Sequence, residues 1–303
     1  MKYKPLDCPP AVTIPSTVDV PGFATHHTPA GATVYSIKSS ELDLVRISVV
    51  FRAGSRYQHH PFTASATVDM LAEGTASHTS EELSRMLDYY GIYYSTSIDR
   101  DYSVITLCCL NRFLDETLCF LSEILSEPLF SDSELAVYAS KRKQKLTVER
   151  TRVDVMATEL FWKSIYGENH PYGKSSPETA YDSLTPDHLK RFFADHYTIE
   201  NSFTVVSGNI EPRFVDRISS AIDTLPHGRM VYAPMAEPCS VSYAKTDKAD
   251  ALQSSLRMGR VLFDANHPDY VTMQVAVTLL GGYFGSRLVR NLREDKGYTY
   301  GIV

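Results

Sequence analysis

The feature that most constrains the fold of this chain is an internal repeat. One pattern of strand, polar turn, helix, glycine, short helix and glycine occurs twice, and its copies lie about 207 residues apart, the distance from Gly74 to Gly281. The other matched pairs are Asp43 with Asp250, His60 with His267, Pro61 with Pro268, Leu87 with Leu292, and Gly91 with Gly297. A repeat of this length predicts two similar domains, each built from one copy of the pattern.

The two copies differ in length. Val303 corresponds to about position 97 of the first copy, which itself continues to about residue 225. The pattern therefore predicts a second domain that is incomplete in this chain, with roughly 128 residues missing. We assign a leader to residues 1–24, the first domain to 25–226, a linker to 227–238 and the start of the second domain to 239–303. Gly228 and nearby prolines give the linker its composition.

Local patterns predict the elements of the first domain. Alternating polar and apolar residues predict strands, and apolar residues three or four positions apart predict helices. The strands are expected in a hairpin turning at Pro29 to Gly31 and at 42–53, 92–98, 102–110 and 203–206. The helices are expected at 62–71, 80–90, 114–126, 132–150, 155–166, from 185 onward, and 212–224. Ser80 is expected to cap the second helix and Gly91 to end it.

Composition excludes several classes of function. A net charge of −6 and a pI near 5.9 argue against nucleic-acid binding, and the basic run Lys141 to Lys145 is interpreted as a solvated helix face. No stretch approaches the roughly 20 apolar residues of a membrane span, and no signal peptide is recognised at the N-terminus. Five cysteines without Cys-x-x-Cys spacing favour free thiols in a reducing, cytoplasmic setting.

Two separated segments carry a resemblance to a known family. The sequence HPYG at 170–173, followed by SLTPDHLKRFFADHYTIENSFTVVSGNI at 183–210, resembles proteins related to insulinase, pitrilysin and the mitochondrial processing peptidase. The segment GGYFGSRLVRNLREDKGYTY at 281–300 resembles the second domain of these proteins. The resemblance implies an α+β fold of two similar domains, each a mostly antiparallel sheet with helices on one face, which enclose an extended peptide between them.

In catalytic members of that family, the first-domain helix carries the motif H-x-x-E-H. Its two histidines bind zinc, its glutamate activates a water molecule, and a downstream glutamate completes the ligand set. The three positions of this motif hold Ser65, Val68 and Asp69 here, and Gln144 and Lys145 stand near the downstream position. The resemblance therefore implies a member without catalytic residues, without metal ligands and without a zinc cofactor.

A displaced set of metal ligands is the alternative for an active enzyme. Asp69 and Glu73 are four residues apart on one helix, and His59 and His60 precede that helix. Adjacent histidines point in divergent directions in an extended chain, so they make a poor chelate. A solvated or capping role is the simpler interpretation of these carboxylates.

The second-domain segment retains the residues that position substrate in the family. The resemblance implies that Arg293 and Tyr300 orient a peptide backbone, and the paired Gly281 and Gly282 permit close approach of an extended ligand. The structural alternative is that Arg293 pairs with Glu294 or Asp295 while Tyr300 packs on a sheet.

We thus expect a non-catalytic subunit of this peptidase family. It would bind peptide substrates and help to enclose them, as a dimer with a zinc-bearing homologue or with itself, and would contact neither nucleic acid nor membrane. Two alternatives remain open: an active zinc metalloendopeptidase with a displaced ligand set, and a peptide-binding scaffold that works without a peptidase partner.

Overall fold

A six-stranded sheet is the centre of the fold. The computed structural model describes residues 13, 17, 20–38, 42–232, 241 and 243–302. The sheet has the order β1-β2-β6-β3-β5-β4. Only β2 and β6 pair in parallel, so the mostly antiparallel α+β architecture is confirmed. The strands are β1 (Ala24–His27), β2 (Thr33–Lys38), β3 (Leu44–Phe51), β4 (Tyr93–Ile98), β5 (Ser103–Leu110) and β6 (Ser202–Gly208).

Alternation along the strands decides which face of the sheet is buried. In β3, Val45, Ile47, Val49 and Phe51 are all buried, whereas Arg46 between them is exposed. Because successive side chains of a strand point to opposite faces, these four residues present one apolar face. That face joins a single hydrophobic core with residues of the neighbouring strands and of the helices.

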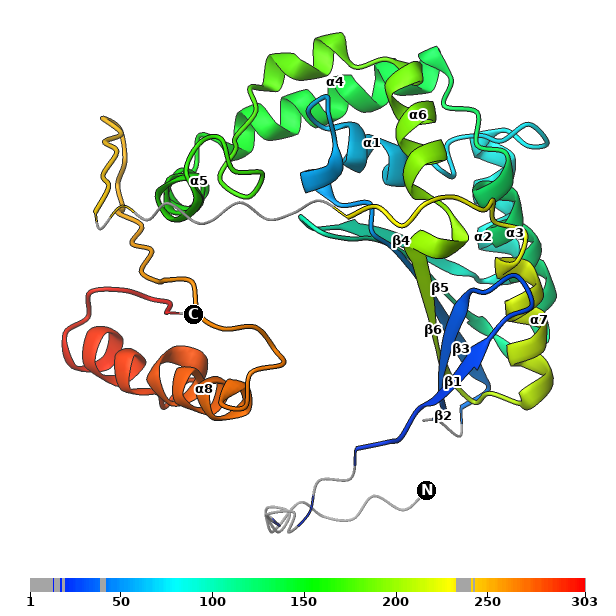
Figure 1. Ribbon diagram of the computed structural model, residues 1–303. Helices are drawn as coiled ribbons and strands as arrows, with labels where there is room; N and C mark the ends of the chain where they lie inside the picture. Colours follow the sequence, from blue (N-terminus) through cyan, green and yellow to red (C-terminus); the bar gives the residue numbers. More distant parts are fainter. Residues whose placement is uncertain are drawn as a thin grey trace, which may run out of the picture.

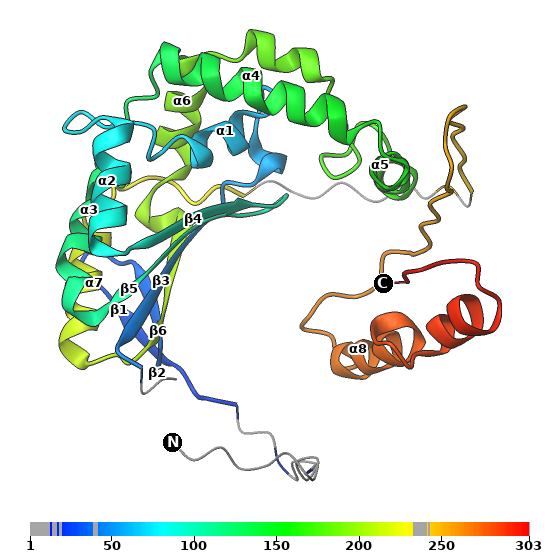
Figure 2. The ribbon, with the colours of Figure 1, turned by 180° about the vertical axis from the view of Figure 1, so that it is seen from behind.

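Seven α-helices form within the described part of residues 25–226. Helices α1, α3 and α7 contact the sheet, and α6 packs on α1. Figures 1 and 2 show that α4 lies above α1 and that α5 lies beyond the end of β4. None of the described helices has the length and apolar composition needed to cross a membrane. The helices are α1 (Thr63–Asp69), α2 (Ser80–Tyr90), α3 (Leu114–Ser126), α4 (Asp132–Glu149), α5 (Val153–Tyr166), α6 (Pro186–His196) and α7 (Pro212–Ile222).

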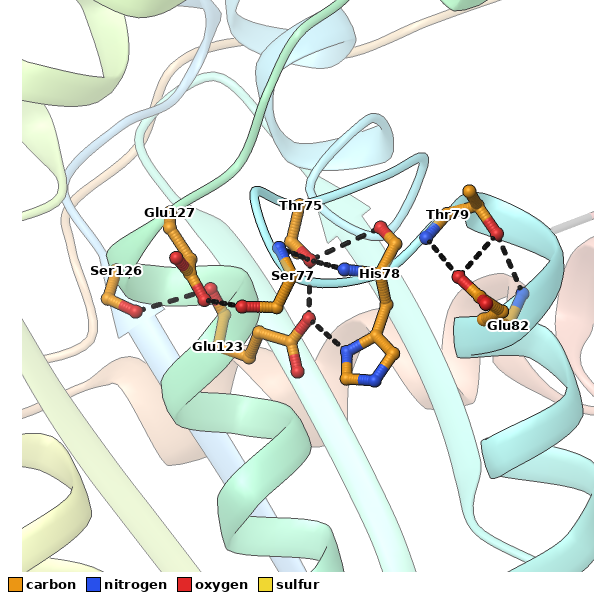
Figure 3. A network of polar contacts seen from close by, with 8 residues as sticks. All are labelled: Thr75, Ser77, His78, Thr79, Glu82, Glu123, Ser126 and Glu127. Carbon is orange, nitrogen blue, oxygen red and sulfur yellow. Dashed lines mark hydrogen bonds and ion pairs between the residues drawn. The ribbon is translucent and has the colours of Figure 1, made fainter.

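The loop between α1 and α2 is fixed by its polar residues. Thr79, and not Ser80 as expected, caps α2: its hydroxyl accepts from the Glu82 amide, while the Glu82 carboxylate accepts from the Thr79 amide. His78 Nδ1 lies 2.9 Å from the carboxylate of Glu123 on α3, which also accepts from the Thr75 hydroxyl (Figure 3). Gly91 ends α2 in the left-handed conformation, as expected.

The second copy of the repeat has the helices of the first but not its strands. It contains α8 (Tyr270–Val277) and two π-helical segments, η5 (Thr278–Gly282) and η6 (Val289–Asp295). The repeat also predicts a Tyr-rich strand after Gly297, by analogy with the strand that follows Gly91. Within residues 243–302 no strand forms, so this prediction is wrong. A strand requires a neighbour for its backbone hydrogen bonds, and this segment contains none. Residues 227–232 of the predicted linker are neither helix nor strand, and 233–238 lie outside the described residues.

Candidate functional site

Helix α1 carries the three positions that the resemblance assigns to the zinc motif, Ser65, Val68 and Asp69. It begins after Phe62, whose φ of 66° turns the chain sharply into the helix. The side chain of Gln58 accepts a hydrogen bond from the Ala64 amide, which anchors the first turn. The helix packs against β4, β5 and α6.

The first two motif positions hold side chains that do not suit zinc. The Ser65 hydroxyl donates to the Phe62 carbonyl at 3.0 Å, within its own helix. Val68 has 0% exposure and belongs to the hydrophobic core. Neither a neutral hydroxyl that is already engaged nor a buried isopropyl group resembles the imidazole and carboxylate donors that zinc sites use.

The third motif position, Asp69, is held by three donors. Its carboxylate accepts from the Thr96 hydroxyl of β4 at 3.0 Å, and from the Tyr138 hydroxyl and the Arg142 guanidinium of α4 at 3.0 Å and 2.9 Å. Burial raises the pKa of Tyr138, so its phenol stays protonated and remains a donor. A guanidinium therefore supplies the positive charge beside this carboxylate, and a zinc ion does not fit there.

Arg142 was missed by sequence reasoning, which placed Gln144 and Lys145 near the downstream ligand position. Lys145 instead pairs with Glu149 at 3.8 Å on the exposed side of α4. The interpretation of the basic run as a solvated face is thus wrong for Arg142. Tyr138 and Arg142 are four residues apart and lie on one helical face. That spacing was the available signal for an inward-facing pair.

The displaced ligand set does not converge. Glu73 accepts from the Ser80 hydroxyl, whereas Asp69 faces Thr96 and α4. The ring of His60 stacks on His188 of α6 with centroids 4.4 Å apart, and its Nε2 lies 3.0 Å from the Ser183 hydroxyl. Among the described residues no three His, Cys, Asp or Glu side chains gather as a metal site would require.

The predicted substrate-positioning residues lie on the C-terminal segment. The Arg293 guanidinium stacks on the ring of Phe284 at 4.9 Å, and no ion pair joins it to Glu294 or Asp295 among the described residues. Tyr300 is 91% exposed and packs on no sheet. Gly281 and Gly282 belong to η5 and precede Tyr283. The structure therefore shows neither an ion pair of Arg293 with Glu294 or Asp295 nor a Tyr300 that packs on a sheet, among the described residues.

A cavity of about 630 Å³ opens beside the start of α1. Ser65 lines it on one side, and the turn between β4 and β5 lines another through Arg100. Trp162 of α5 and Tyr172 of the loop that follows form the remaining wall. His170 of the HPYG sequence is 3% exposed and accepts a hydrogen bond from the Tyr172 amide, so it orders this loop.

Comparisons with known proteins identify both parts of the chain. Residues 33–170 match the model of insulinase (peptidase family M16), and residues 183–303 match that of the peptidase M16 inactive domain. An uncharacterized zinc protease of Rickettsia felis is 22% identical over 284 residues, covering 90% of this chain and 67% of the relative. The non-peptidase homolog YmxG of Helicobacter pylori is 23% identical over 262 residues, which cover 84% of this chain and 60% of the relative.

A solved structure supports the same fold. The peptidase M16 inactive domain from Pseudomonas fluorescens matches with a TM-score of 0.79 and 23% identity, covering 92% of this chain and 69% of that one. Fold and comparisons together define an α+β protein of the peptidase M16 type. The chain belongs to the insulinase family, peptidase family M16. It spans about two thirds of the length of the relatives it matches.

Proposed function

We propose that this chain is a non-catalytic subunit that encloses and positions peptides for a zinc-bearing homologue. The observation that carries the proposal is the contact between α1 and α4, where Arg142 and Tyr138 hold Asp69. Without a glutamate at Val68, α1 offers no general base at the motif position. The name non-peptidase homolog, borne by the Helicobacter pylori relative, fits a non-catalytic member.

The free edge of the sheet supports a peptide-binding role. Among the described strands β4 pairs with β5 alone, so its other edge leaves backbone groups available. An extended peptide can add to such an edge through main-chain hydrogen bonds. The Thr96 hydroxyl of β4 reaches Asp69, so a peptide on this edge would lie close to α1.

The second-domain residues enter the proposal as peptide contacts. Arg293 offers a forked cationic donor and Tyr300 a neutral donor, and both suit the carbonyl groups of a bound peptide. The exposure of Tyr300 leaves its hydroxyl open to a ligand or to the partner subunit. The described cysteines, Cys108, Cys109 and Cys119, are free thiols, which supports placing this subunit in a reducing cytoplasm.

Reconstitution with a homologue that carries H-x-x-E-H tests the proposal. The chain alone should leave an unstructured fluorogenic peptide intact, and cleavage should rise when the two chains are mixed. Replacing Arg293 by Ala, or Tyr300 by Phe, should lower kcat/KM of the mixture, whereas Arg290→Ala on the same segment should not. Chelator-sensitive cleavage by the chain alone would contradict the proposal.

A further inference from the structure

The cavity beside α1 contains an arginine whose guanidinium lies over two aromatic rings. The Arg100 guanidinium lies 4.1 Å from the centroid of the Trp162 ring and 5.6 Å from that of Tyr172. Its Nε donates to the Tyr172 carbonyl at 3.2 Å. Cation–π contacts of this kind restrict the position of the guanidinium, and the hydrogen bond to Tyr172 uses its Nε and not its two outer nitrogens.

The backbone that carries Arg100 is fixed in place. Amides of Gly54, Ser55 and Arg56 donate to the carbonyls of Asp101, Asp99 and Arg100, at 3.0 to 3.1 Å. A Cβ at Gly54 would come within 2.4 Å of the Arg100 backbone, so only glycine allows this approach. The turn between β4 and β5 is therefore tied to the segment that leads into α1.

The loop that carries Tyr172 is equally tight. A Cβ at Gly173 would lie 2.2 Å from the carbonyl oxygen of Gly167, so the chain can fold back on itself there only with glycine. Burial first, and the hydrogen bond to Asp101 second, raise the pKa of Tyr172 to about 12. The phenol thus stays protonated, and its hydroxyl donates a hydrogen bond to the Asp101 carboxylate.

The acidic groups around the cavity already have partners. Asp101 accepts from Arg56 at 2.7 Å as well as from Tyr172, and Glu159 accepts from Arg150 at 3.0 Å. The carboxylate of Asp99 accepts from the backbone amides of the turn. Among the described residues no carboxylate lies within ion-pair distance of Arg100.

We propose that this cavity binds a carboxylate of the peptide, with Arg100 as the donor and Trp162 and Tyr172 as the walls. A planar guanidinium with two open nitrogens matches the geometry of a carboxylate. The cavity also lies where β4 ends, at Ile98, so a peptide added to that edge would place a side chain or its terminus there. This inference rests on the proposed peptide-binding function and names the chemistry that the site selects.

Trp162 is the single tryptophan of the chain, so its fluorescence reports directly on this cavity. The test titrates the full 303-residue chain with three short acetylated peptides that differ only at one central residue and at the C-terminus. The first has a central Glu and an amidated C-terminus, the second has Gln in place of Glu, and the third has Gln with a free C-terminal carboxylate. Fluorescence anisotropy of labelled peptides gives the affinities independently of Trp162.

At least one carboxylate-bearing peptide should bind about tenfold more tightly than the neutral peptide, as a charge-assisted hydrogen bond implies. The peptide that binds more tightly shows whether the bound carboxylate belongs to a side chain or to the C-terminus. Arg100→Gln should remove the preference and Arg100→Lys should keep part of it. The matched control is Arg112→Gln, because Arg112 also stacks on a ring, that of Phe113 at 4.7 Å, but outside the cavity.

Two results would overturn the carboxylate site while leaving peptide binding intact. One is equal affinity for all three peptides, and the other is a preference that survives Arg100→Gln. A third result, no binding of any peptide, would overturn the inference and would also count against the proposed function. These readouts separate failure of the site from failure of peptide binding.

Discussion

Helices α1 and α8 stand at matching places in the repeat, yet their environments differ. Val68 of α1 is 0% exposed, whereas its counterpart Val275 of α8 is 55% exposed. Met70 and its counterpart Val277 differ in the same way, because their side chains are 1% and 52% exposed. Helix α1 packs on β4, β5 and α6, whereas the contacts of α8 are chiefly with η5, the segment that directly continues it. A similar apolar pattern thus becomes a core only where a sheet covers it.

The largest expected difference in stability between the two helices comes from replacing Val68 or Val275 by a charged residue. Val68→Asp should lower the free energy of unfolding by about 4 kcal/mol or more, because an unpaired carboxylate would replace a core side chain. Val275→Asp should cost less than about 0.5 kcal/mol, because that side chain is exposed. Urea denaturation of both variants measures the difference. Equal costs would mean that α8 is buried as deeply as α1.

A smaller effect is expected at the contact between α1 and α4. A double-mutant cycle of Asp69→Asn and Arg142→Gln should give a coupling of about 1 kcal/mol, because both side chains are partly screened by solvent. The matched cycle of Lys145→Gln and Glu149→Gln should give almost none, since that pair is more exposed. A coupling at the first pair no larger than at the second would show that Asp69 does not depend on Arg142.

The smallest effect concerns the loop between α1 and α2. The hydrogen bond to Glu123, with attraction by the same carboxylate, raises the pKa of His78. Its contribution to stability is therefore complete below the unfolded pKa of about 6.5 and is lost as the pH rises through the higher folded pKa. The second copy has Tyr283 to Gly285 at this place and no histidine.

Unfolding measurements below and above that range check this assignment. The difference in stability between the wild type and His78→Gln should be larger at about pH 5.5 than at about pH 8.5. Glu123→Gln should remove the dependence on pH. A difference that grows with pH would reverse the assigned sign.

Local signals in the sequence predict the secondary structure of the first domain well. The turn at Pro29 to Gly31 joins β1 and β2, and Gly91 ends α2, because turn and cap residues act on their immediate neighbours. The end of α4 was placed one residue too far, and α5 begins two residues earlier than expected. Helix ends depend on capping contacts that spacing alone does not fix.

The candidate site was less predictable because its residues are distant in sequence. Asp69 and Arg142 are 73 positions apart, and only the packing of α4 over α1 brings them together. Arg100 and Trp162 meet for a similar reason, through the turn after β4 and the placement of α5. The assignment of Ser65, Val68 and Asp69 to the motif positions stays a prediction from the sequence. The spacing of Tyr138 and Arg142 indicates an inward-facing pair, but their contact with Asp69 depends on how α4 packs over α1.

Zinc content tests the central claim most directly. The purified chain is incubated with zinc, dialysed against zinc-free buffer and measured by inductively coupled plasma mass spectrometry. With Asp69 held by Arg142 and no histidine at the motif positions, close to zero zinc ions per chain should remain. Retention of one zinc ion per chain, lost with a chelator together with peptidase activity, would contradict the account.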